Sequence, residues 1–181
     1  MSGAPPLAIA TYRLVFSTFI LLPFYVRSGG FNRLLASSFR DLLSLATVGV
    51  VLAIHFGSWI TSLSLTSVAS SVLFVHVDPI FVAVVSHFYL KERIARGTLV
   101  GITLAFLGAS TIAFSDAGVS DVRLLGDFLA LIGALMLGFY ILAGRRLRQS
   151  LNLVSYVTPV YAFSAVTLAL ASLAGGTSLW P

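Results

Sequence analysis

The sequence VASSVLFVHVDPIFVAVVSHFYLKERIARGTLVG, residues 68–101, is the clearest indication of the fold of this chain. Its first 23 residues, Val68 to Leu90, are an apolar segment long enough to cross the hydrocarbon core of a bilayer as a helix. His76, Asp78 and Pro79 stand at the middle of this segment, where a polar side chain or a missing backbone donor is most costly. We therefore expect a membrane-spanning helix that is interrupted near its centre.

The composition is that of an integral membrane protein. Of the 181 residues, 58% are hydrophobic and only 9% are charged, and the mean hydropathy is +1.01, whereas a soluble domain has about 25% charged residues. A net charge of +5 would suggest nucleic-acid binding in a soluble chain. Here the basic residues lie in short loops between apolar segments, so topology explains them and no nucleic-acid partner is expected.

Six apolar segments have about the length that a spanning helix needs. The sequence therefore predicts an all-α, polytopic transmembrane bundle of about six spans. The segments are Leu7 to Val26, Leu43 to Leu63, Val68 to Leu90, Thr98 to Ser115, Leu124 to Ala143 and Val154 to Leu173.

The loops between these segments alternate in charge. Loops 27–40, 91–96 and 145–148 contain nine of the eleven Lys and Arg residues. The connection 64–67 is uncharged, and the connection 116–126 is mainly acidic. The excess of basic residues in cytoplasmic loops predicts that the three basic loops face the cytoplasm of a cell-membrane protein and that both termini are extracytoplasmic. A chain that starts outside the cytoplasm with a short N-terminal tail is unusual, and one further helix upstream would restore a cytoplasmic start. We therefore expect truncation at both ends.

Small residues recur at helical spacing in two places. Such rows let another helix backbone approach closely, and they predict tight packing within the bundle. The rows are Gly97, Gly101, Ala105 and Ala109, and then Gly126, Ala130, Ala134 and Gly138.

His76 and Asp78 are the first candidates for a functional site, because an ionisable residue at mid-membrane depth is a functional hypothesis by default. Residues two positions apart on a continuous helix point about 200° away from each other. We therefore expect one of them to line a pathway and the other to bond a neighbouring helix. The structural alternative makes Pro79 a kink and His76 an interhelical hydrogen-bonding residue.

His55, Trp59 and Arg13 are the other candidates. His55 and Trp59 are one turn apart on one helix face, which suits an amphipathic substrate through hydrogen bonding and stacking. The alternative makes Trp59 an interfacial anchor and His55 a helix–helix contact. Arg13 lies two turns inside its span, where it would recognise an anionic group, pair with Asp78 or extend to the membrane surface.

Enzyme and cofactor signals are missing from the sequence. There is no Cys, which excludes disulfides and thiolate metal sites. His55, His76 and Asp78 share a depth but have no metal-ligand spacing, and no nucleophile motif or phosphate loop is present. We expect no enzyme, no metal and no cofactor, and a transport activity would depend on a gradient.

Several short motifs together resemble one family. They are Ser62 to Ser71, Asp78 to Phe81, Leu90 to Arg93, Gly101-Ile102, Leu107-Gly108 and Gly126 to Leu131. In this order they are similar to the drug/metabolite transporter superfamily, specifically its EamA-type members. Arg13 matches an arginine found early in that family's second helix.

The resemblance implies an architecture of ten helices in two inverted five-helix repeats. Residues 1–118 would be most of the first repeat without its first helix, and residues 119–181 would be the start of the second repeat without its last three. It also implies a secondary transporter, or a fragment of one, that moves small metabolites or drugs across the membrane by alternating access. Asp78, His76, His55, Trp59 and Arg13 would then line the substrate site.

Partners and coupling follow from the same resemblance. We expect a small-molecule substrate, a lipid bilayer and coupling to protons or another cation, with proton coupling through Asp78 or His76. The chain would act as a homodimer or pair with another half-transporter. The alternative is a non-transporting truncated product or an interaction subunit that pairs with another chain.

Overall fold

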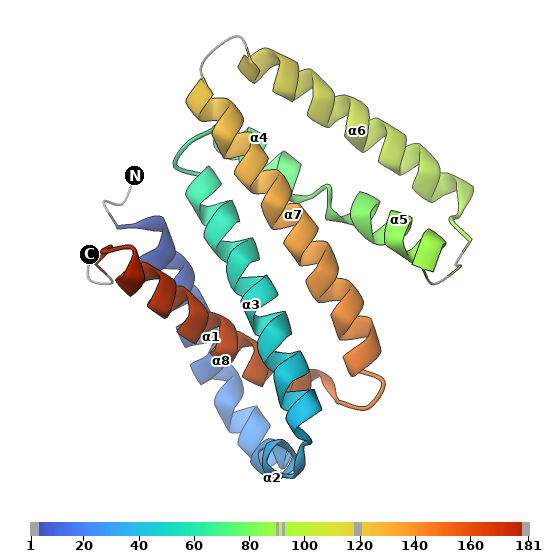
Figure 1. Ribbon diagram of the computed structural model, residues 1–181. Helices are drawn as coiled ribbons and strands as arrows, with labels where there is room; N and C mark the ends of the chain where they lie inside the picture. The colour runs from blue at the N-terminus through green and yellow to red at the C-terminus, as the bar shows by residue number, and fades with distance from the viewer. Residues whose placement is uncertain (1–3, 90, 92, 118–120, 179–181) are drawn as a thin grey trace. The chain divides into compact units, whose positions relative to one another are not determined.

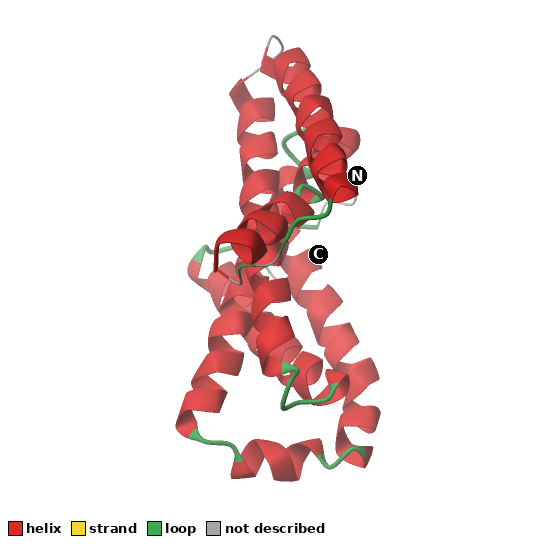
Figure 2. Cartoon of the chain, turned by 90° about the vertical axis from the view of Figure 1, so that its right-hand side faces the viewer, coloured by secondary structure: helices red, strands yellow, loops and turns green. Residues whose placement is uncertain are grey.

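The computed structural model describes residues 4–89, 91, 93–117 and 121–178. Every regular element in those ranges is an α-helix, as Figure 2 shows, so the predicted all-α fold is confirmed. The helices of Figure 1 are α1 (Pro6–Arg27), α2 (Gly30–Ala36), α3 (Phe39–Ser62), α4 (Val68–Val75), α5 (Asp78–Tyr89), α6 (Arg96–Ala117), α7 (Asp121–Leu147) and α8 (Leu153–Ala174). The expected segment end at Leu90 and the expected repeat boundary at 118–119 lie outside the described residues.

The predicted spans correspond to helices of the structure. Within the described residues, five helical stretches are long and apolar enough to cross a membrane, and the stretch Arg96–Gly108 of α6 is a shorter apolar helix. The multi-pass membrane architecture follows from these lengths and compositions. The third predicted span is divided into α4 and α5, at the place where the sequence has its polar interruption.

One element was not predicted from the sequence. The short helix α2 occupies the first basic loop and lies across the space between the ends of α1 and α3 (Figure 2). It begins after Gly29, whose φ of +71° is a left-handed conformation that glycine adopts without strain. Tyr25 covers the start of α2, because a Cβ on Gly30 would overlap its ring.

The chain packs as two compact units, which share α3 and α7. Unit 1 comprises residues 1–57 and 140–181, and unit 2 comprises residues 58–139. Each unit has its own packed interior.

Unit 1 is built on the pairing of α1 with α8, which lie side by side (Figure 1). Leu14 of α1 and Val160 of α8 are among its most completely buried side chains. The N-terminal half of α3 crosses α8 closely, because a Cβ on Gly49 would lie 2.5 Å from Cβ of Phe163 and 3.1 Å from the carbonyl oxygen of Val160. Small residues at such crossings allow the van der Waals contact that holds helices together in lipid.

The two basic loops of unit 1 lie at the same end of that unit. Nη1 of Arg33 in α2 donates a hydrogen bond to Oγ of Ser155 at 3.2 Å. Ser155 is in the first turn of α8, directly after the loop that follows 145–148. The contact joins the first basic loop to the start of α8, and the side of the membrane on which these loops lie stays a prediction.

Unit 2 is built on the packing of α4 and α5 against α7. Oγ1 of Thr66 donates to Oδ1 of Asp127 at 2.8 Å, and a Cβ on Gly126 would lie 2.8 Å from the backbone nitrogen of Thr66. The connection between α3 and α4 therefore lies against the N-terminal part of α7. Phe74 of α4 packs on the fully buried Ala130 of α7.

The two rows of small residues behave differently. The row on α7 is buried within unit 2, as the sequence predicted. On α6 the prediction of tight packing is not met among the described residues, because a Cβ on Gly97 or Gly101 would have no atom within 4 Å. This face of α6 is directed away from the other described helices of its unit.

The surface of the bundle is apolar. Five large apolar side chains of α1 are more than half exposed, and they are Phe16, Phe19, Ile20, Phe24 and Val26. An exposed apolar surface of this kind would be unfavourable in water and is suited to contact with lipid chains.

Candidate functional site

The break between α4 and α5 is the main irregularity of the backbone in unit 2. α4 ends at Val75 and α5 begins at Asp78, while the amide of Val77 donates to the carbonyl of Phe74 at 3.3 Å. Pro79 has no N–H, so the carbonyl of Val75 loses the donor that a continuous helix would supply. Polar backbone is thereby placed in the middle of an apolar span.

His76 and Asp78 flank this break with different environments. The Nδ1 atom of His76 donates to the carbonyl oxygen of Val72 at 2.8 Å, and the rest of the side chain is exposed. Asp78 is buried, with 8% of its surface exposed, and the His76 ring is within electrostatic reach of its carboxyl group. Asp78 is also the first residue of α5, where the helix dipole favours a negative charge.

The expected 200° separation of His76 and Asp78 assumed one continuous helix. Because Val77 lies in a turn between two helices, that angle does not describe the structure. His76 bonds a carbonyl of its own helix α4, where we expected one of the two residues to bond a neighbouring helix.

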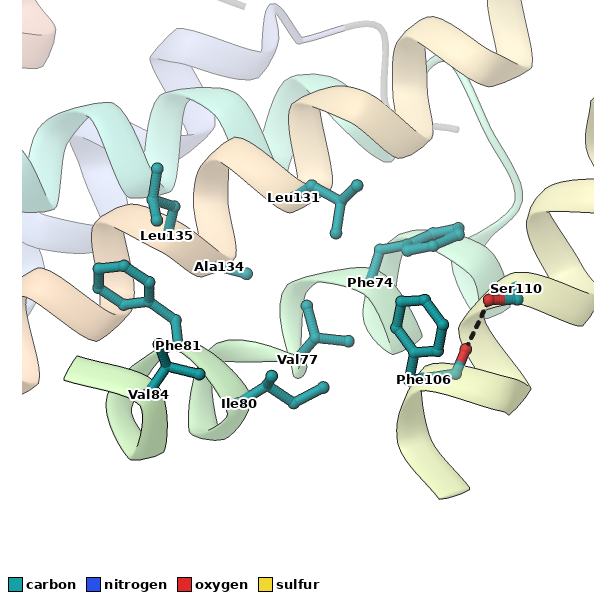
Figure 3. A pocket seen from close by; sticks show the side chains of 10 residues that line it. All are labelled: Phe74, Val77, Ile80, Phe81, Val84, Phe106, Ser110, Leu131, Ala134 and Leu135. Atoms are coloured by element: carbon teal, nitrogen blue, oxygen red, sulfur yellow. Dashed lines mark hydrogen bonds between the residues drawn. The ribbon is translucent and has the colours of Figure 1, made fainter. Parts of the chain in front are cut away.

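A cavity of about 460 Å³ lies beside the break, between α4, α5, α6 and α7 (Figure 3). Its wall is almost wholly apolar, and the hydroxyl of Ser110 donates to the carbonyl of Phe106 at 2.8 Å. The lining residues are Phe74, Val77, Ile80, Phe81, Val84, Phe106, Ser110, Leu131, Ala134 and Leu135. A cavity of this size and lining is suited to an apolar or aromatic part of a small molecule.

Small residues of α7 hold one side of this cavity in place. A Cβ on Gly138 would overlap the ring of Phe81, which also packs edge to face on Phe139 with ring centroids 4.8 Å apart. Ala134, one turn earlier, leaves open space where a larger side chain would project into the cavity. The row of small residues on α7 therefore brings α5 close while it leaves room beside the break.

The cavity was not predicted from the sequence. Val77 and Ile80 line the cavity. The predicted site residues His76 and Asp78 are close to them in sequence but are not part of the lining. The signal that could have pointed to the cavity was the row of small residues on α7, because that face of the helix packs against α5 beside the break.

Arg13 and His55 lie together in unit 1, around the ring of Phe56. The guanidinium carbon of Arg13 is 5.0 Å from the centroid of that ring, a cation–π distance. The ring of His55 meets the same ring edge to face at 4.7 Å, and His55 is buried. The pairing of Arg13 with Asp78 stays a prediction, because the two residues belong to different units.

Trp59 is half-buried on α3, one turn beyond His55. Neither the anchoring role nor the substrate-stacking role suggested for it is tested by the structure. Among the described residues there is no group of three or more His, Cys, Asp or Glu side chains that would hold a metal ion.

The chain was compared with known proteins in three ways. The family model described as "EamA-like transporter family" matches residues 1–114. Neither the curated proteins nor the solved structures gave a match. The family match covers more than half of the chain and includes the break between α4 and α5. The chain therefore belongs to the EamA-like transporter family.

Proposed function

We propose that this chain is a secondary transporter, or a fragment of one, that moves a small metabolite or drug across the cell membrane by alternating access. Membership of a transporter family supports the general activity. The sequence contains no ATP-binding motif, so transport would be driven by a gradient. Residues 1–118 would represent most of the first repeat and residues 119–181 the start of the second.

The observation that carries the proposal is the broken span beside an apolar cavity. In transporters, discontinuous helices place polar backbone near the bilayer midplane at the substrate site. Here the break between Val75 and Asp78 adjoins a cavity of about 460 Å³. Irregular backbone at this depth is tolerated where it lines a cavity or is buried in protein.

The proposed substrate has an apolar or aromatic part that enters the cavity and a polar part that contacts the break. Asp78 and His76 would bind or exchange the coupling proton, because carboxyl and imidazole groups are the usual proton carriers inside membrane proteins. Arg13, His55 and Trp59 would contribute to the site from α1 and α3. Amino acids, nucleosides and organic ions all fit this description, and any of them is a suitable probe.

Uptake into proteoliposomes tests the proposal directly. A set of amino acids, nucleosides and organic ions is first screened for a rise in the melting temperature of the purified chain, and each stabilising compound is then measured in uptake. We expect Asp78→Asn to lower uptake at least tenfold and to remove its dependence on a pH gradient. Asp121→Asn is the matched control, because Asp121 is an exposed carboxylate at the start of α7. If Asp78→Asn leaves uptake and its pH dependence unchanged, the proposed role of Asp78 in proton coupling is wrong.

The proposed orientation places the basic loops in the cytoplasm. The chain has no Cys, so single cysteines at positions 37 and 120 report the side of the membrane without background. We expect a membrane-impermeant thiol reagent to label the two positions from opposite sides. Labelling of both positions from the same side would refute the orientation.

The alternative is a subunit that pairs with another chain, either a second copy or another half-transporter. One observation favours it: a Cβ added to Gly97 or Gly101 of α6 would have no described atom within 4 Å. Close helix association in membranes commonly uses such residues. Light scattering in detergent would show a dimer that Gly101→Leu converts to a monomer, whereas a monomeric wild-type chain that transports would exclude this alternative.

A further inference from the structure

A second pocket, separate from the break, lies in unit 1 between the end of α7 and the start of α8. Its volume is about 380 Å³. The residues that line it are Tyr140, Ile141, Gly144, Arg145, Arg148, Leu153, Tyr156 and Val157. It combines two cations, two phenols and an apolar wall.

The two tyrosines give the pocket a fixed wall. Their rings stack with centroids 5.9 Å apart and planes inclined by 25°, and the hydroxyl of Tyr156 donates to the carbonyl of Tyr140 at 3.3 Å. A Cβ on Gly144 would lie 3.1 Å from the Tyr156 hydroxyl oxygen. Tyr156 is buried, so its ring is held against α7 by contacts on several sides.

The charges around the pocket have one sign. Arg145 is in the last turn of α7, and Arg148 follows directly after that helix, within electrostatic reach of both phenols. Leu153 is the first residue of α8, so the positive end of a 22-residue helix dipole also borders the pocket. No carboxylate is among the lining residues.

Further positive charge approaches from another helix. Arg33 of α2 donates to Ser155 of α8, next to the buried Tyr156. The pocket therefore borders the start of α8, the helix that Arg33 contacts, at the end of membrane-spanning helices. Basic pockets between helices at this level are suited to the phosphate of a lipid headgroup.

We propose that this pocket binds a phosphate ester. The guanidinium groups of Arg145 and Arg148 would bind the phosphate oxygens, for which paired planar donors are well matched. Ile141, Leu153 and Val157 would contact the organic part of the ligand. The ester is the headgroup of an anionic phospholipid or a soluble phosphate ester, and both present the same chemistry to the arginines. This inference does not depend on the proposed transport function.

Binding to the full-length chain in a nonionic detergent tests the inference. Four probes are titrated by calorimetry: short-chain phosphatidylglycerol, short-chain phosphatidylcholine, glycerol phosphate and inorganic phosphate. We expect phosphatidylglycerol or glycerol phosphate to bind, and the double variant Arg145→Gln/Arg148→Gln to weaken that binding about tenfold or more, because each lost contact is a hydrogen bond to a charged group. Tight binding of phosphatidylglycerol alone identifies a lipid ligand, and comparable binding of glycerol phosphate identifies a soluble ester.

Two control variants separate the pocket from the general basic surface. Arg27→Gln/Arg40→Gln removes the same charge from the first basic loop. It should change the affinity less than about threefold, because neither residue lines the pocket and salt screens charges that lie away from the ligand. Leu153→Trp keeps both pocket arginines but fills the space between them and α8, and should also weaken binding about tenfold.

Three results would overturn the inference. One is equal weakening by the two double variants, which would indicate a surface effect. Another is unchanged affinity in Leu153→Trp. This variant tests the inference even if Arg145→Gln/Arg148→Gln does not fold. The third is equal binding of phosphatidylcholine and phosphatidylglycerol, or no binding of any phosphate probe.

Discussion

Gly49→Ala is the change whose effect the structure defines most sharply. Gly49 lies where α3 crosses α8, and the added methyl carbon would lie 2.5 Å from Cβ of Phe163. It would also lie 3.1 Å from the carbonyl oxygen of Val160 and 3.2 Å from the backbone nitrogen of Ser164. A Cβ atom and two backbone atoms cannot be moved by a side-chain rotation, so the two helices must separate.

The cost follows from that separation. Carbon atoms pack at about 3.5–4.0 Å, so the backbones of α3 and α8 would move apart by roughly 1 Å. Insertion of an extra carbon into a packed interior typically costs about 1–3 kcal/mol. A cost of about 2 kcal/mol would lower the melting temperature of a chain of this size by roughly 4–8 °C.

Gly101→Ala is the matched control. The same methyl group on α6 would have no described atom within 4 Å, and alanine favours a helix more than glycine does. Both variants are purified in the same detergent and melted with circular dichroism as the readout. We expect a lower melting temperature for Gly49→Ala and an unchanged or higher one for Gly101→Ala. Equal melting temperatures for the two variants would refute the close crossing of α3 and α8.

Three further predictions concern single side chains. Thr66→Val removes the hydroxyl that donates to Asp127 at 2.8 Å and should lower the free energy of unfolding by about 1.5–3 kcal/mol, whereas Thr66→Ser should not; equal melting curves for the two would count against this hydrogen bond. Ala134→Leu should lower uptake at least tenfold by filling the cavity beside the break, with little change in melting temperature, and undiminished uptake would remove the cavity from the transport pathway. Arg13→Leu should cost about 0.5–1 kcal/mol through the lost contact with the ring of Phe56, and Arg13→Lys should restore most of it; a lysine variant as unstable as the leucine variant would exclude a cation–π contribution.

Five of the six expected spans were predictable from the sequence because length and hydropathy define them directly, whereas the fourth, expected from Thr98 to Ser115, corresponds to the shorter apolar stretch Arg96–Gly108 among the described residues. The first segment, expected from Leu7 to Val26, is the helix Pro6–Arg27. The interruption of the third span was also predictable, since Pro79 lacks a backbone donor and the polar residues beside it stand out in an apolar segment.

The cavity beside the break was not predictable in the same way. Phe74, Phe81 and Phe106 come from three different helices, and their convergence depends on the rotation of each helix about its own axis. An apolar residue gives little signal for that rotation in a bundle that is apolar on all sides. Close contacts such as that of Gly138 with Phe81 determine it, and the sequence indicated only that α7 had a small face.

The roles of the five candidate site residues stay predictions. Arg13 and His55 share the ring of Phe56 in unit 1, and Asp78 is buried at the break in unit 2. Transport measurements on variants of these residues distinguish substrate binding from structural support.

Accessibility of the break is the most direct test of the central claim that it lines a substrate pathway. Val77 lies in the turn and lines the cavity, and the chain has no natural cysteine. A single cysteine at position 77 is treated in oriented vesicles with a membrane-impermeant thiol reagent from each side, with and without a transported compound. Alternating access predicts labelling from both sides, with the compound slowing the reaction. Labelling only by a membrane-soluble reagent, and from neither aqueous side, would show that the break does not line a substrate pathway.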